Sequence, residues 1–170
     1  MKSFFYTLSL VLLVSLFGCQ ESEEPFQSPL SGTWENREFD EAAGLWFVEV
    51  LTFKNDTLME VQKIVRETEI GETLGYRMIA DSWYNLEGST FKYYYSYALI
   101  NFGGASDSEE KPYGTKEELK PGVVDFFRVP TGTLTFFENG NRFRFQEDCW
   151  RVGTAEDCLP FPLREYVRVN

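Results

Sequence analysis

The sequence predicts one all-β domain over residues 31–170, an antiparallel up-and-down β-barrel of about 8–9 strands. Aromatic residues make up 17% of the 170 residues, and large rings beside β-branched neighbours favour pleated strands over helices. From Ser31 onward, short segments alternate between apolar and polar side chains and are separated by turn residues. No helical pattern exceeds two turns, so we expect successive strands to run antiparallel with short connections.

The first half of the domain predicts strands at 33–39, 45–54, 58–67, 74–86 and 90–100. The strand at 45–54 carries the clearest pattern, because its apolar side chains recur on one face. These side chains are Leu45, Phe47, Leu51 and Phe53. Asn55-Asp56 supplies a tight turn after this strand, and Glu87-Gly88-Ser89 joins the last two strands as a hairpin.

The second half predicts strands at 123–129, 133–138, 142–146 and 163–169. Asn139-Gly140 predicts a two-residue type I′ hairpin, because both central positions of that turn require a positive φ. The connection at 101–122 is longer than the roughly 12–15 residues that are usual in compact domains. Thr115–Lys120 within it carries a capping-box pattern that favours a one-turn helix. This connection is either a lid over the barrel mouth or an inert insertion.

The amino-terminal segment has the features of a secretory signal. Lys2 precedes an apolar run from Phe4 to Phe17, which is too short to cross a bilayer as a helix. The run ends in Leu16-Phe17-Gly18-Cys19, which resembles the lipobox of bacterial lipoproteins. The resemblance implies that residues 1–18 are removed as a signal peptide and that acylated Cys19 anchors the chain in the lipid bilayer. The alternative is an ordinary cleaved signal with an incidental cysteine.

Residues 19–30 are expected to form a tether between the anchor and the barrel. Gln20–Glu24 is acidic, Pro25 and Pro29 follow, and no apolar periodicity is present. An acidic patch directly behind the lipidated cysteine resembles the surface-export signal of Bacteroidota lipoproteins. The resemblance implies a protein exposed on the bacterial outer membrane, and a periplasm-facing domain is the alternative.

Charge and histidine content exclude several classes of function. The net charge of −11 opposes binding to nucleic acid, which requires a concentrated positive surface. The absence of histidine excludes Ser-His-Asp catalysis and His-ligated metals. No carboxylate pair lies in a recognisable catalytic frame, so we expect a non-enzyme without cofactor or metal; a two-carboxylate glycosidase is the remaining enzymatic alternative.

The two cysteines of the domain predict a structural disulfide. Cys149 and Cys158 remain once Cys19 is set aside, and the chain is destined for an oxidising compartment. Their spacing differs from Cys-x-x-Cys, and no histidine is available for a shared metal. A disulfide between them would close a small loop and contribute about 2–3 kcal/mol to stability.

Gly32-Thr33-Trp34 opens the first strand, and Arg168 lies in the last one. Together with the antiparallel order of strands, this resembles the lipocalin-like lipoproteins of Bacteroidota. The resemblance implies that Gly32 lets the entering chain turn, that Trp34 closes the barrel floor, and that Arg168 stacks on Trp34. It also implies non-catalytic binding of a small hydrophobic or amphipathic ligand inside the barrel.

One strand offers a candidate wall for that ligand. Phe91, Tyr93, Tyr95 and Tyr97 alternate along 90–100 and are expected to share one face. An inward row could line a ligand pocket, or it could fill the core, with the tyrosine hydroxyls reaching water at the ends of the barrel. If side chains fill the barrel, the alternative function is a structural module that docks a protein or glycan partner.

Asp56-Thr57-Leu58 resembles the short O-glycosylation signal of Bacteroidota secreted proteins. The resemblance implies that Thr57, in an expected turn, accepts a glycan.

Overall fold

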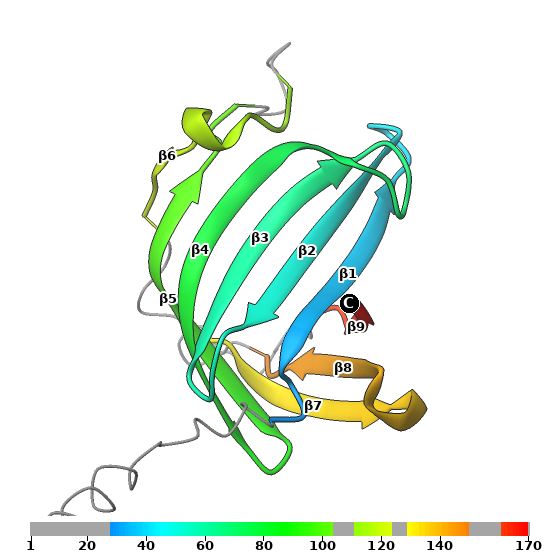
Figure 1. Ribbon diagram of the computed structural model, residues 1–170, viewed down its shortest axis with the longest axis vertical. Coiled ribbons are helices and arrows are strands. Elements are labelled where there is room, and N and C mark those ends of the chain that lie inside the picture. The colour runs from blue at the N-terminus through cyan, green and yellow to red at the C-terminus, as the bar shows by residue number, and fades with distance from the viewer. Residues whose placement is uncertain (1–27, 104–110, 124–128, 150–160, 170) are drawn as a thin grey trace, which may run out of the picture.

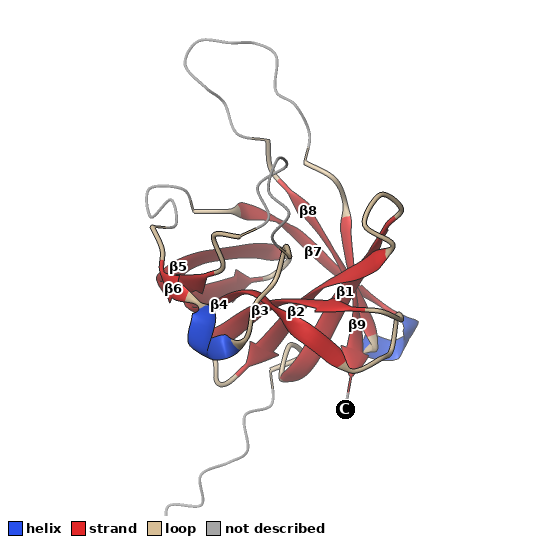
Figure 2. Ribbon diagram, turned by 90° about the horizontal axis from the view of Figure 1, so that it is seen from above, coloured by secondary structure: helices blue, strands red, loops and turns tan. Residues whose placement is uncertain are grey.

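The computed structural model describes residues 28–103, 111–123, 129–149 and 161–169. Most of this part is antiparallel β-sheet, and the strands close into a ring, which confirms the predicted barrel-like fold (Figures 1 and 2). The sheet order is β4-β3-β2-β1-β9-β8-β7-β5, and pairing of β4 with β5 closes the ring.

Apart from β6, which lies in the connection predicted at 101–122, the strand bounds match the predicted ones to within a few residues. They are β1 Gly32–Asp40, β2 Leu45–Phe53, β3 Leu58–Arg66, β4 Thr73–Glu87, β5 Thr90–Ile100, β6 Lys120–Pro121, β7 Thr131–Phe137, β8 Arg142–Glu147 and β9 Arg164–Val169. Short 3₁₀ helices span Lys116–Glu118 and Glu138–Gly140. The expected strand at 123–129 falls mainly on 124–128, outside the described residues, and Val123 and Val129 lie in no strand.

Aromatic rings dominate the barrel interior. Trp34 and Phe143 meet edge to face with centroids 4.8 Å apart, and Phe143 stacks on Tyr166 at 4.6 Å. Phe91 and Phe145 meet edge to face at 5.4 Å. Because each such ring buries about 150–250 Å² and gains further from its packing geometry, this aromatic core is the main source of stability. Between the register shifts of β3, β4 and β5, interior positions alternate with outward ones along the strands.

The entering chain seals one end of the barrel, which we call the floor. Leu30 is fully buried, and its carbonyl accepts a hydrogen bond of 2.8 Å from the Trp34 indole N–H. The Arg168 guanidinium lies 4.3 Å from the Trp34 ring centroid and donates hydrogen bonds to the carbonyls of Pro29 and Ser31. Gly32 has φ +102°, a conformation that side chains disfavour. The structure therefore places Gly32, Trp34 and Arg168 together, as the resemblance implies.

A β-bulge between β4 and β5 and another between β3 and β4 change which side chains face inward, and a further register shift in β3–β4 lies between Val65 and Arg66. Between β4 and β5, Asp81 pairs with Tyr97 but Ser82 pairs with Tyr95, so Ser96 has no partner position. Tyr97 consequently lies on the outer face and is 50% exposed. The expectation that Tyr97 shares a face with Phe91, Tyr93 and Tyr95 is therefore wrong, because the inserted residue reverses the alternation.

The second bulge lies between β3 and β4. Lys63 pairs with Met78 and Ile64 pairs with Tyr76, so Arg77 is the inserted residue. Its guanidinium lies over the ring of Phe47, with 4.7 Å from the guanidinium carbon to the ring centroid. Phe47 pairs with Glu38 across β1 and β2, at the end of the barrel opposite the floor.

The β7–β8 hairpin forms where Asn139-Gly140 predicts it, but its turn is longer than expected. Phe137 pairs with Arg142, which leaves a four-residue loop in place of a two-residue type I′ turn. Positive φ values occur at Glu138, Asn139 and Gly140. Asn139 and Gly140 thus adopt the left-handed conformation that these residue types tolerate, and Glu138 adopts it as well.

The described part of the long connection lies beside strands β4 and β5 of the barrel. Gly114 forms an isolated bridge with Tyr76 of β4, and β6 pairs with the end of β5. The predicted one-turn helix is confirmed at Lys116–Glu118, where the Glu118 carboxylate accepts a 2.7 Å hydrogen bond from the Thr115 amide. Residues 104–110 lie outside the described part, so the lid remains a prediction.

Candidate functional site

The barrel is open at the end opposite the floor, and a cleft lies there. Ladder pairing between β1 and β9 stops at Glu35 and Val167, after which the Asn36 side chain donates 2.9 Å to the Glu165 carbonyl. Figure 1 shows the long strands β2–β5 rising beyond the shorter β7 and β8. The seam therefore parts and leaves an open space of about 190 Å³. This mouth cleft is lined by Asn36, Glu38, Phe47, Val48, Glu49, Lys63, Ile64, Arg77 and Arg164.

Arg77 is the cation with the most freedom to meet a ligand in the mouth cleft. Its side chain is exposed, and its guanidinium carbon lies over the Phe47 ring at 4.7 Å from the centroid, within the range of a cation–π contact. Among the residues that the structure describes, no carboxylate oxygen lies within 4.0 Å of a guanidinium nitrogen of Arg77, so Arg77 forms no ion pair there. The N–H edge of its guanidinium is therefore available in the cleft.

A cluster of charged and phenolic side chains closes the cleft from below. Arg164 donates to Glu147 at 3.0 Å and to the Tyr93 hydroxyl oxygen at 3.3 Å, and it pairs with Glu49 at 3.5 Å. The Tyr166 hydroxyl donates to the Glu49 carboxylate. We call these five residues the interior cluster. Its hydrogen bonds satisfy charges that would otherwise be costly to bury.

Three members of the interior cluster, Arg164, Tyr93 and Tyr166, keep one protonation state near neutral pH. Burial alone would lower the pKa of Arg164, but the neighbouring oxygens of Tyr166, Tyr93 and Glu49 outweigh this and raise that pKa. Burial raises the pKa of Tyr93, and it raises that of Tyr166 well above its ordinary value. Arg164 therefore stays charged and both phenols stay protonated, which suits a structural seal better than proton transfer.

Below the interior cluster, side chains fill the barrel. The space bounded by Phe91, Tyr93 and Tyr95, together with the rings of Phe143 and Tyr166, holds about 10 Å³, which is room for roughly one water molecule. Phe91 and Tyr93 are buried members of the core, and Tyr95 packs against it. Of the four residues expected to line a ligand pocket, three thus point inward but contact one another, and Tyr97 lies outside.

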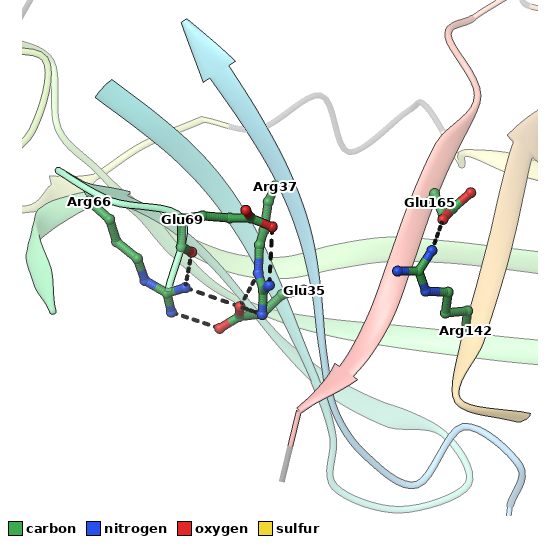
Figure 3. A network of polar contacts seen from close by, with 6 residues as sticks. All are labelled: Glu35, Arg37, Arg66, Glu69, Arg142 and Glu165. Atoms are coloured by element: carbon green, nitrogen blue, oxygen red, sulfur yellow. Dashed lines mark hydrogen bonds and ion pairs between the residues drawn. The ribbon is translucent and has the colours of Figure 1, made fainter. Parts of the chain in front are cut away.

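A second charged group, the outer ion network, lies on the outside of the wall (Figure 3). The carboxylate of Glu35 pairs with Arg37 at 2.7 Å and with Arg66 at 2.7 Å, and Glu69 reaches Arg37 at 3.5 Å. Burial alone would raise the pKa of Glu35, but hydrogen bonds from Arg66 and Arg37 outweigh it and hold this pKa below its ordinary value. All four groups are paired with one another, so the network favours a role in stability.

The outer face of β4 and β5 carries exposed aromatic side chains. Trp83 pairs directly with Tyr94, and both are exposed, as is Tyr97 beyond the bulge. We call these three residues the outer aromatic strip. The apolar positions Val48, Val50 and Ile64 also point outward, but they are buried beneath neighbouring side chains.

The remaining predicted sites lie at the limits of the described chain. Cys19 and Cys158 are outside the described residues, and Cys149 follows β8 at the end of a described range, so the disulfide stays a prediction. Thr57 lies exposed in the turn between β2 and β3, where its amide donates 2.9 Å to the Asn55 side chain. Its glycosylation also stays a prediction.

Sequence reasoning missed the charged residues of the mouth cleft. Glu49 occupies an inward position of the alternating series Phe47, Glu49, Leu51, and a carboxylate at such a position is the signal that could have identified it. Arg77 had no such signal, because its orientation depends on the bulge. In the described ranges, no group of three potential metal ligands occurs, and no helix is long and apolar enough to cross a membrane.

Comparisons of the chain with protein-family models, with curated proteins and with solved structures found no match.

Proposed function

We propose that this protein is a lipid-anchored lipoprotein of the bacterial cell envelope that binds a small ligand, without catalysis, in the mouth cleft. The observation that carries the proposal is the contrast between the two ends of the barrel. The cleft offers about 190 Å³ between charged side chains, whereas the space among the interior rings admits about one water. Within the described barrel, a small ligand therefore has room at the mouth and not among the interior rings.

This proposal changes where the ligand is expected to bind. The lipocalin-like resemblance implies an apolar molecule inside the barrel, beside Tyr93 and Tyr95. Those rings pack edge to face at 5.7 Å and leave no volume for it. The mouth cleft is instead charged, with one aromatic wall formed by Phe47. A polar or amphipathic molecule fits this lining better than a hydrocarbon.

The proposed anchor also determines which way the cleft faces. Eight residues lie between Cys19 and Ser28, the first described residue, and the nine residue-to-residue steps span at most about 30 Å. Ser28 and Leu30 lie at the floor of the barrel. With Cys19 acylated, the floor would therefore lie toward the bilayer and the mouth cleft would open away from it.

Native mass spectrometry of the full chain, extracted from its own membrane in mild detergent, tests the proposal. We expect a bound small molecule that is lost from the variant Phe47→Ala, which removes the aromatic wall of the cleft. The matched control Tyr95→Phe changes the interior and should retain the molecule. Loss from Tyr95→Phe with retention in Phe47→Ala would place the ligand inside the barrel, and a bare mass in every sample would contradict a retained ligand.

A partner-docking module is the second candidate function, favoured by the outer aromatic strip. Exposed aromatic side chains grouped on one surface are typical of contact sites. Cross-linking of the full chain on intact cells, with Trp83→Ala compared with the wild type, tests it. A cross-linked product that disappears in Trp83→Ala supports docking, and a product that is equal in both proteins opposes it.

A further inference from the structure

We propose that the mouth cleft binds an anionic group, a carboxylate or a phosphate, on the guanidinium of Arg77, with Lys63 as the second cation. This inference rests on the proposed function and names the ligand chemistry of the same site. Four observations support it: the bulge that orients Arg77, the lack of a carboxylate partner, the charge of the lining, and the stacking on Phe47.

The bulge in β4 accounts for the orientation of Arg77. In regular alternation, Met78 points inward and its neighbours on both sides point outward. The register shift between Lys63 and Ile64 inserts Arg77 as an extra residue and lets its side chain reach Phe47 on the inner side of the wall. Bulges that redirect one side chain are over-represented next to functional sites.

The pairing of charges leaves Arg77 unmatched. Of the cations that line the cleft, Arg164 is engaged by Glu147 and Glu49, and Lys63 lies 3.8 Å from Glu49. Arg77 has no carboxylate partner within the described part of the chain. An incoming anion could therefore form charge-assisted hydrogen bonds with the Arg77 guanidinium.

The lining as a whole is more positive than the protein. It contains the cations Lys63, Arg77 and Arg164 against the carboxylates Glu38 and Glu49, whereas the full chain carries a net charge of −11. A local excess of positive charge on an acidic protein selects for anions at this one place. Glu38 is exposed and opposes the anion, so its removal should strengthen binding.

Stacking on Phe47 prepares the guanidinium for a planar acceptor. A guanidinium that lies against a ring presents its N–H groups in the plane, where a carboxylate or phosphate accepts two of them at once. The ring also offers an apolar surface to the body of the ligand. At about 190 Å³, the cleft is smaller than the roughly 300–1,000 Å³ of sites for drug-sized ligands, so the anion belongs to a small molecule.

Ligand-observed fluorine NMR on the full chain in mild detergent tests the inference. The probes are 4-fluorobenzoate, 4-fluorophenyl phosphate and the neutral isostere 4-fluorobenzamide. We expect at least one anionic probe to bind with about tenfold higher affinity than the benzamide, because a hydrogen-bonded charge is lost in the neutral probe. The stronger of the two anions identifies the group as carboxylate or phosphate.

Variants assign the effect to Arg77. We expect Arg77→Gln to weaken binding of the preferred anion about tenfold, Arg77→Lys to weaken it less, and Glu38→Gln to strengthen it about two- to threefold. Arg142→Gln, which removes a cation outside the cleft lining, is the matched control and should leave binding unchanged. Each variant must retain the cooperative urea unfolding of the wild type.

Equal binding of the anions and the benzamide, or anion binding that is insensitive to Arg77→Gln, would overturn the inference. If Phe47→Ala then abolished binding of all three probes, the proposed function would stand while the anion assignment failed. If no probe bound, the inference would fail as well, and the native mass spectra of the extracted protein would decide the proposed function separately.

Discussion

Replacement of Glu35 by Gln isolates the contribution of the outer ion network to stability. The Glu35 carboxylate is only 8% exposed and receives contacts of 2.7 Å from both Arg37 and Arg66 (Figure 3). Gln keeps the size of the side chain and one acceptor oxygen but removes the negative charge. Of the two largely buried guanidinium groups, Arg37 would then keep the exposed carboxylate of Glu69 as its ion-pair partner, and Arg66 would keep a hydrogen bond to the Glu69 backbone carbonyl.

The expected cost follows from this burial. Removing one partner from a fully buried ion pair costs about 3–5 kcal/mol, because the other charge is left without compensation. Water reaches part of both arginine side chains, and the Gln oxygen retains one hydrogen bond, so we expect Glu35→Gln to lower the free energy of unfolding by about 2–3 kcal/mol.

Glu165 is the matched control, because it also bridges two arginines. Its carboxylate contacts Arg142 at 2.8 Å and Arg144 at 3.0 Å, but it is 34% exposed. Exposed ion pairs contribute about 0–1 kcal/mol, so we expect Glu165→Gln to cost less than about 1 kcal/mol.

Urea unfolding of the full chain, followed by tryptophan fluorescence, measures both variants. Equal losses of unfolding free energy in Glu35→Gln and Glu165→Gln would refute the reasoning from burial. A loss below about 1 kcal/mol in Glu35→Gln would show that water screens the outer network as well as it does a surface pair.

Further predictions concern pH, the floor, one glycine and one phenol. Because the folded pKa of Glu35 lies below the ordinary value of 4.5, its contribution is complete above pH 4.5 and is lost as the pH falls through the folded pKa; the stabilities of wild type and Glu35→Gln should therefore converge in acid urea titrations. Arg168→Met should lower the free energy of unfolding by about 2–3 kcal/mol, measured in urea, because the floor carbonyls lose a charged donor and Trp34 loses its cation. Gly132→Ala should destabilise more than Gly88→Ala in the same assay, because a Cβ at 132 would lie 2.1 Å from a backbone oxygen, whereas at 88 nothing lies within 4 Å and only the strain of φ +62° opposes it; equal losses would contradict this. Burial raises the pKa of Tyr84 to about 12, so Tyr84→Phe should remove a phenol that ionises near pH 12 in an ultraviolet titration, and removal of one near pH 10 would contradict its burial.

The strand layout could be predicted from the sequence because it depends on local pattern. Alternation at 45–53 places Leu51 and Phe53 inside, and the structure has both in the core. Turn residues located the hairpins, since Gly and Asn accept positive φ wherever they occur. The contact of Arg168 with Trp34 was expected from a resemblance. In the structure the two residues lie opposite each other on the paired strands β1 and β9.

The orientation of Arg77 and Tyr97 could not be predicted, because each depends on one inserted residue. A bulge reverses the alternation beyond it without changing the apolar content of the segment, so the pattern gives no sign of its position. Where a bulge forms depends on the pairing between two neighbouring strands, which is a property of the assembled barrel. The mouth cleft, formed where β9 separates from β1, is likewise set by tertiary structure.

The location of a bound anion tests the account most directly. Backbone amide shifts of the isotope-labelled full chain, recorded during titration with 4-fluorobenzoate, would map the binding site residue by residue. Our account predicts the largest shifts at Phe47, Lys63 and Arg77 and none at the core residues Phe91 and Phe143. Largest shifts at Phe91 and Phe143 would contradict it, because the ligand would then occupy a barrel interior that this structure shows as filled.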